Sequence, residues 1–189
     1  MHDDLFSPLM VPGRWHLGGL KHGNDYLFYN PTPELMEPGT WPITVLQEGV
    51  ETDFSCISGS LPIISQKVRD ALSDLDEIKI PYRHTVLEPV QIEGNDLSTC
   101  YFIMITEDKL DCVDENRSRF HVWTEEDAPS PSHIGQYATF EKLIIDSEKA
   151  GGRNLFRLSR SPGTLIVSEL VKARMESVYT TGVVFTPAS

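Results

Sequence analysis

The chain has 189 residues, of which 40% are hydrophobic, and these values predict one globular domain over residues 1–189. Its 28 acidic residues outnumber its 16 basic residues, so the formal net charge is −12. Such a charge disfavours binding to nucleic acid and to anionic membranes, and it favours association with basic partners. Acidity also serves solubility in many proteins, so the charge alone does not identify a function.

The cysteines and the N-terminus indicate a compartment. Cys56, Cys100 and Cys112 are an odd number, widely spaced and without a CxxC pair. They therefore predict no disulfide framework and fit a reducing environment. The first residues are acidic where a signal peptide is basic, and no apolar run approaches the roughly 18 residues that span a bilayer. We expect a cytoplasmic protein.

The first third of the chain predicts short strands between turns. The chain is rich in Gly, Pro and aromatic residues up to about residue 40, with strand candidates at Pro12–Leu17 and Tyr26–Tyr29. Trp41–Leu46 is a further strand candidate. Thr52–Cys56 is interpreted either as its hairpin partner or as a loop that leads to the next element.

A helix is expected after the apolar segment Leu61–Ile64, with Ser65 as its N-cap. One face of this helix is apolar at i, i+3, i+4 and i+7 spacing, through Val68, Ala71, Leu72 and Leu75.

The middle of the chain predicts mainly strands. The candidates are Ile78–Tyr82, Thr85–Ile92, Tyr101–Ile105 and Tyr137–Asp146, with a turn at Gly94–Asp96 and a polar loop at Glu125–Ser132. Asp111–Asp114 and Arg119–Trp123 are expected to form an antiparallel pair.

The C-terminal part predicts a strand, a helix and a last strand. Leu165–Val167 is a dense apolar and β-branched run after a polar turn at Ser159–Gly163, which contains the turn signal Pro162–Gly163. Ser168 stands where a helix N-cap belongs. The helix has an apolar face at Val171, Met175 and Val178, and Gly182–Phe185 returns as a strand. The glycines of a nucleophile elbow are absent beside Ser168, which predicts a structural serine. Altogether we expect an α+β fold with a mostly antiparallel sheet and about two short amphipathic helices.

Catalytic and cofactor motifs are weak. The histidines lack metal-ligand spacing and the glycine pairs lack a phosphate-binding pattern, so we expect no metal, no cofactor and no enzymatic activity. One alternative is a small hydrolase that uses the acidic region Asp108–Glu115, or a thiol triad of Cys112, His121 and Asp114. Another alternative is a self-assembling scaffold protein.

Two acidic patches are candidates for binding a basic partner. One consists of Asp74, Asp76 and Glu77, after the first helix. The other consists of Glu125, Glu126 and Asp127 beside Trp123. An aromatic side chain with a charged rim is typical of a protein interface, although such clusters also occur as solvated loops.

Several short motifs occur in order along nearly the whole chain: Pro12–Leu17, Asp53–Ser55, Asp111–Glu115 with Ser118–Arg119, Gly135–Tyr137, Ile145–Asp146, Phe156–Arg157, Leu165–Glu169, Gly182 and Phe185. This series resembles the Imm11 family of bacterial immunity proteins, also called the DUF1629 or Myxococcus-type family.

The resemblance implies a cytoplasmic protein that binds and neutralises a polymorphic toxin encoded by the adjacent gene. Such toxins are often delivered by type VI or related secretion systems, and many carry nuclease domains. It implies no catalytic residues. The charge of −12 suits an inhibitor of a basic, nucleic-acid-binding toxin. The oligomeric state stays open.

Overall fold

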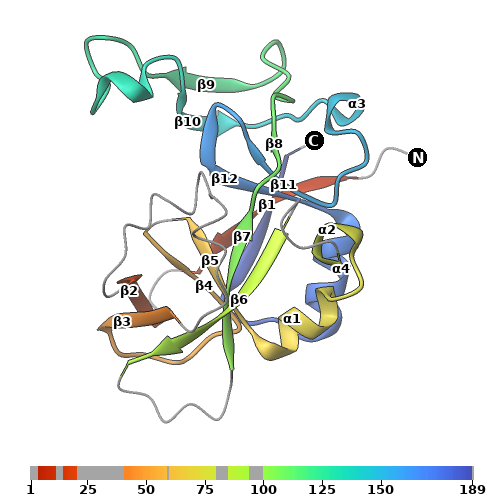
Figure 1. The fold of residues 1–189 in the computed structure, drawn as a ribbon. Coiled ribbons are helices and arrows are strands. Elements are labelled where there is room, and N and C mark those ends of the chain that lie inside the picture. The colour runs from red at the N-terminus through yellow and green to blue at the C-terminus, as the bar shows by residue number, and fades with distance from the viewer. Residues whose placement is uncertain are drawn as a thin grey trace.

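The computed structural model describes residues 4–11, 15–20, 41–58, 60–79, 85–93 and 100–188. The strands form sheets of five, six and two strands (Figure 1). In spatial order the five-stranded sheet contains β13 (Val183–Pro187), β1 (Leu5–Met10), β12 (Ser161–Ser168), β11 (Leu155–Leu158) and β8 (Lys109–Leu110). The six-stranded sheet contains β2 (His16–Leu20), β3 (Trp41–Gln47), β6 (Thr85–Ile92), β7 (Tyr101–Thr106), β5 (Leu61–Ser65) and β4 (Phe54–Ile57).

The remaining elements are short. The two-stranded sheet pairs β9 (Arg119–Val122) with β10 (Tyr137–Lys142), and the helices are α1 (Gln66–Leu72), α2 (Asp76–Lys79), α3 (Ser147–Ala150) and α4 (Glu169–Ser177). Strand pairs are antiparallel except β3 with β6 and β8 with β11. The predicted α+β fold with a mostly antiparallel sheet is thus confirmed. The sequence missed α2 and α3 because one helical turn is too short to show an apolar stripe.

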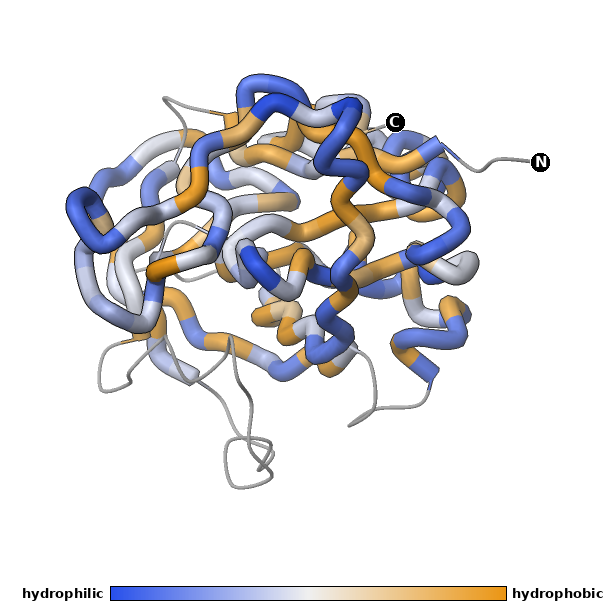
Figure 2. Tube along the Cα trace, turned by 90° about the horizontal axis from the view of Figure 1, so that it is seen from above, coloured by the Kyte–Doolittle hydropathy of each residue, from blue (hydrophilic) through white to orange (hydrophobic). Residues whose placement is uncertain are grey.

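The central strands of both large sheets are buried on both faces, which explains why they read as continuous apolar runs. All six residues of β7 are buried. Its odd-numbered residues, such as Ile103, pack into one core, and Phe102 and Met104 pack into a second core on the opposite face. In Figure 2 the interior strands are mainly hydrophobic and the outer turns mainly hydrophilic.

The second core joins the two sheets to helices α1 and α4. It contains Phe6 from the five-stranded sheet, Phe54 from the six-stranded sheet, and the helical residues Val68, Val171 and Met175. The helices lie together on one side of the sheets in Figure 1. The predicted apolar faces of both helices are confirmed, except that Ala71 and Val178 are only half-buried.

The two predicted serine caps have different outcomes. The Ser168 hydroxyl accepts a hydrogen bond from the Val171 amide at 3.4 Å, which confirms it as the N-cap of α4. Ser65 occupies the N-cap position of α1 but makes no side-chain cap bond. Its hydroxyl is directed toward Asp53, where it donates to Oδ1 at 3.0 Å.

The predicted strand at Ile78–Tyr82 begins as a helix, and the structure decides between the two interpretations of Thr52–Cys56. Ile78 and Lys79 belong to helix α2, where both amides donate to the Leu75 carbonyl, at 3.0 and 2.9 Å. β4 pairs with β5 and not with β3, so Thr52–Cys56 leads into a new hairpin. 

The polar turn predicted at Ser159–Gly163 is confirmed only in its first two residues. Leu158 pairs with Ser161, so the chain turns at Ser159 and Arg160, and Pro162–Gly163 lies inside β12. A proline-glycine pair is tolerated there because the strand begins at this point.

The predicted pairing of Asp111–Asp114 with Arg119–Trp123 is wrong. β9 pairs with β10, whereas Val113 forms an isolated bridge with Ile145. The Asp114 carboxylate accepts hydrogen bonds from the amides of residues 116 and 117, at 3.1 and 3.2 Å, and so closes a tight turn. The predicted strand at Tyr137–Asp146 ends at Lys142, and Ile145 continues only as the bridge.

Some predictions lie outside the described residues: the Tyr26–Tyr29 strand, the Gly94–Asp96 turn, the beginning of Pro12–Leu17 and the end of Ile78–Tyr82. None of the described helices is long and apolar enough to cross a membrane.

Candidate functional site

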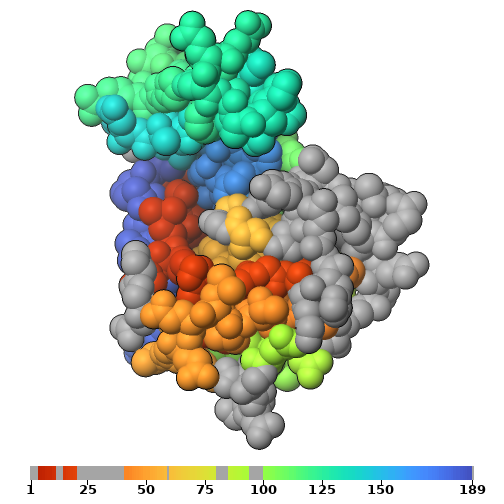
Figure 3. Space-filling model, turned by 90° about the vertical axis from the view of Figure 1, so that its left-hand side faces the viewer, coloured from red at the N-terminus to blue at the C-terminus, as the bar shows by residue number. Residues whose placement is uncertain are grey.

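Residues 115–142, which we call the lobe, project from one end of the five-stranded sheet. Figure 3 shows them in green and cyan above the rest of the molecule. The rings of Phe120 and Phe140 lie 4.8 and 4.9 Å from the ring of Tyr137. Tyr137 belongs to a third core, which includes Leu5 and Ile166 of the five-stranded sheet, and both phenylalanines pack against this core. The lobe is therefore anchored by a small aromatic cluster of its own.

Arg160, at the tip of the β11–β12 hairpin, holds the lobe in place. Its carbonyl accepts from the Tyr137 amide at 2.7 Å, and its Nε donates to the Gly135 carbonyl at 2.9 Å. Its guanidinium lies 4.4 Å from the centre of the Tyr137 ring. Its Nη1 also donates to Glu115, whose pKa is lowered by the hydrogen bonds from Tyr137 and Arg160.

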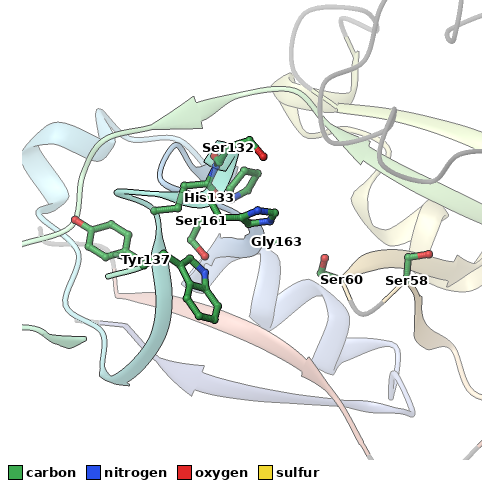
Figure 4. A pocket seen from close by; sticks show the side chains of 10 residues that line it. Ser58, Ser60, Ser132, His133, Tyr137, Ser161 and Gly163 are labelled. Carbon is green, nitrogen blue, oxygen red and sulfur yellow. The ribbon is translucent and has the colours of Figure 1, made fainter. Parts of the chain in front are cut away.

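A pocket of about 660 Å³ lies between the lobe and the strands of the two large sheets. In Figure 4, Ser58 and Ser60 of the β4–β5 turn lie across this hollow from His133 and Ser161. The pocket is lined by side chains from three segments of the chain: Ser58 and Ser60; Trp123, Ser132, His133, Gln136 and Tyr137; and Ser161, Pro162 and Gly163.

The polar groups of the pocket are held by neighbours. Ser130 lies 2.8 Å from the Ser132 hydroxyl and 2.7 Å from Nδ1 of His133. The fully buried Arg157 supports two of the residues that line the pocket: it donates to the carbonyls of Pro162 and Ser60, at 2.7 and 3.2 Å. No carboxylate is among the residues that line the pocket, so the described part of the chain shows no serine–histidine–acid arrangement there.

Trp123 links the pocket to the acidic turn that follows it. Its amide donates to the Gln136 carbonyl and its carbonyl accepts from the Gly135 amide, both at 2.9 Å. Its half-buried side chain lines the pocket. The sequence predicted Trp123 as an interface residue but gave no indication of the pocket, whose members are dispersed over 106 residues from Ser58 to Gly163.

The three acidic residues after Trp123 differ in their environment. Asp127 accepts from the amide and the hydroxyl of Thr124, both at 2.7 Å, and its Oδ2 lies 2.5 Å from Nε2 of His121. The Thr124 hydrogen bonds and the His121 contact lower the pKa of Asp127 to about 2. Asp127 is exposed, as Glu125 and Glu126 are, but as an anion it also holds the turn together.

The other predicted patch is divided by the structure. Asp74 forms a two-pronged ion pair with Arg174, in which Nη2 and Oδ2 are 3.2 Å apart, so it connects α1 to α4. Glu77 is only 4% exposed and accepts from the Asn154 amide at 2.7 Å. Asp76 alone is fully open, with 94% of its side chain exposed. These residues do not form one surface, and Figure 1 places α2 on the helical side of the molecule, away from β9 and β10.

The acidic region Asp108–Glu115 is also dispersed. Asp108 pairs with Arg153 at 3.2 Å, Asp114 closes its turn, and Glu115 binds Tyr137 and Arg160. Across the described ranges, no three His, Cys, Asp or Glu side chains gather as metal ligands.

The thiol triad is not assembled. Cys112 is fully buried in the third core, and burial raises its pKa to about 12. His121 contacts Asp127, and Asp114 binds backbone amides. A protonated, enclosed thiol is a poor nucleophile.

A family model described as an immunity protein family, Imm11, matches residues 31–189, which contain the lobe and the whole pocket. None of the curated proteins matches this chain.

Proposed function

This chain belongs to the Imm11 family of immunity proteins, and on that premise we propose that it neutralises its cognate toxin by binding the toxin domain in a stoichiometric complex. The proposed contact surface consists of Trp123, which lines the pocket, and of Glu125 and Glu126 in the turn that follows it. The observation that carries it is the placement of a half-buried tryptophan at a pocket directly beside exposed carboxylates.

This arrangement has the properties of an interface centre. Large aromatic side chains beside pockets supply much of the binding energy in protein complexes, and polar residues surround them. Glu125 and Glu126 form no ion pair within the described residues, so a partner's cations can pair with them. The backbone hydrogen bonds of Trp123 hold its main chain in place before binding, which reduces the entropy lost on association.

The charge favours a basic toxin. A chain with a net charge of −12 attracts a positively charged partner and accelerates the encounter. Nucleases are basic where they bind phosphate backbones, so we propose a nuclease-type toxin of a type VI or related secretion system, inhibited in the cytoplasm. The glutamates would occupy the toxin's substrate channel or a site adjacent to it.

Calorimetry tests this proposal. The titrant is the C-terminal domain of the large protein encoded beside this chain, at low and at high salt. We expect a one-to-one complex with a nanomolar Kd, on the order of −12 kcal/mol, that weakens as salt is added. Toxin activity should disappear at one equivalent of the chain. Absence of binding, or inhibition only at large excess, would contradict the proposed function.

A further inference from the structure

The five-stranded sheet ends at β13, and this edge is uncovered in the described structure. β13 pairs antiparallel with β1 and is the outermost strand. The Val11 amide donates to the Gly182 carbonyl at 3.0 Å, and the Ala188 amide donates to the Leu5 carbonyl at 2.8 Å. These two bonds, at opposite ends of the pairing, establish which residues of β13 face β1.

Hydrogen-bonding groups alternate along an antiparallel strand. The two terminal bonds therefore direct the amides of Val184 and Thr186 toward β1. The N–H and C=O groups of Val183 and Phe185 point outward, along the free edge, and no hydrogen bond to another described segment engages them. An edge with outward-pointing donors and acceptors is a template for an additional strand.

A hollow of about 290 Å³ lies along the same edge, between β13 and helix α4. Val183, Val184 and Phe185 line it from the strand, and Lys172, Glu176 and Thr180 line it from the helix and the turn after it. A strand added to β13 would thus find backbone partners on one side and a half-apolar recess for its side chains. This combination of an edge strand and an adjacent helix groove fits an extended peptide.

The opposite face of the edge is apolar and exposed. Leu9 and Val184 are directly opposite in the β1–β13 register, and they are 52% and 54% exposed. A cross-strand pair of this kind would pack against an apolar side chain of an adjacent added strand.

We propose that β13 receives an extended segment of the toxin domain by strand addition, at the edge formed by Val183 and Phe185. The identity of the partner rests on the proposed function. A second copy of this chain is the less favourable occupant, because each copy carries a net charge of −12 and these charges repel one another. The same charges favour a segment that combines alternating apolar residues with Lys or Arg.

Residue-resolved hydrogen exchange tests the inference on the free chain and on its complex with the toxin domain. In the free chain, we expect fast exchange at Val183 and Phe185 and slow exchange at Val184 and Thr186, which act as internal controls. In the complex, strand addition protects all four amides. A tight complex in which Val183 and Phe185 still exchange fast would overturn the inference and leave the proposed function intact.

A pair of variants isolates the outward amide. Phe185→Pro removes the ring and the N–H, whereas Phe185→Val removes the ring alone, and neither change breaks a bond to β1. We expect Phe185→Pro to bind the toxin domain about tenfold more weakly than Phe185→Val, the loss of one buried hydrogen bond. Equal affinities of the two folded variants would overturn the inference.

Two further outcomes would also overturn the assignment of the toxin segment to β13. Concentration-dependent protection of Val183 and Phe185 in the chain alone, with a dimer in sedimentation, would make a second copy the occupant and overturn the assignment to the toxin. No binding of the unmodified chain would refute the proposed function itself, and with it the partner named here.

Discussion

Asp53 and Thr181 bind each other through both backbone and side chain, although 128 residues separate them in the sequence. The Thr181 amide and hydroxyl donate to Oδ2 of Asp53 at 2.9 and 2.8 Å, and the Asp53 amide donates to the Thr181 hydroxyl at 3.0 Å. Because Asp53 precedes β4 and Thr181 precedes β13, this contact connects an edge of the six-stranded sheet to an edge of the five-stranded sheet. Lys67 of α1 completes the cluster at 2.8 Å.

We predict that Asp53→Asn destabilises the fold by about 2 kcal/mol, since it weakens several charge-assisted hydrogen bonds at once. Partial burial alone would raise the pKa of Asp53, but the hydrogen bonds from Lys67, Thr181 and Ser65 lower it below its ordinary value of 3.8. The stabilisation is therefore complete above that value and is lost as the pH falls below it. Urea unfolding at pH 7 and in the acid range measures both effects. An unchanged pH dependence in Asp53→Asn would contradict this account.

Gly182 is predicted to be irreplaceable for a steric reason that Gly152 lacks. Both have positive φ, of 86° and 72°. A Cβ at Gly182 would lie 2.3 Å from the Phe54 carbonyl oxygen, whereas a Cβ at Gly152 meets nothing within 4 Å. Gly152→Ala should cost about 1 kcal/mol of backbone strain, and Gly182→Ala about 1–3 kcal/mol more. Thermal unfolding of the two variants compares them, and equal losses would show that the contact relaxes freely.

Arg160 is predicted to hold the lobe. Arg160→Ala removes the bond to the Gly135 carbonyl and the contact with the Tyr137 ring, worth about 1–2 kcal/mol together. Tyr137→Phe is the matched control, because it keeps the ring and loses only the hydroxyl. We expect faster hydrogen exchange at the Trp123 amide in Arg160→Ala than in Tyr137→Phe. Similar exchange in both variants would indicate that the aromatic cluster suffices.

The cysteines provide a test against the hydrolase alternative. Cys100 is exposed, whereas Cys112 is fully buried and its pKa is raised to about 12. A thiol-alkylating reagent should therefore modify Cys100 in the native chain and reach Cys112 only after unfolding. Mass spectrometry of the digested protein identifies the sites. Rapid alkylation of Cys112 in the folded chain would support a nucleophilic role for its thiol, as in the hydrolase alternative.

Charge reversal tests the proposed contact surface. Glu125→Lys should lower the affinity for the toxin domain and flatten its dependence on salt, since a rim carboxylate contributes mainly to the encounter. Asp76→Lys makes the same change at an exposed site on α2 and serves as the control. Asp127 is unsuitable for this purpose because it also closes its own turn. Equal effects of the two reversals would indicate a general charge effect and would remove Glu125 from the contact.

Sequence patterns alone determined the elements whose cause is local. The cap at Ser168 and the apolar face of α4 follow from residues within two helical turns, and strands such as Thr85–Ile92 follow from their β-branched composition. The ordered motifs indicated the Imm11 family, and the match of residues 31–189 to the family model shows it.

The tertiary structure decided which elements meet. Alternation identifies a strand but not its partner, so β9 pairs with β10 and not with Asp111–Asp114. The same limit applies to the charges: Glu77 is buried against Asn154, whereas Glu125 stays in solvent, although both stand in similar acidic runs. Whether a side chain is core or surface, or an edge strand is covered, depends on segments far apart in the chain, and those contacts form only when the whole core is packed.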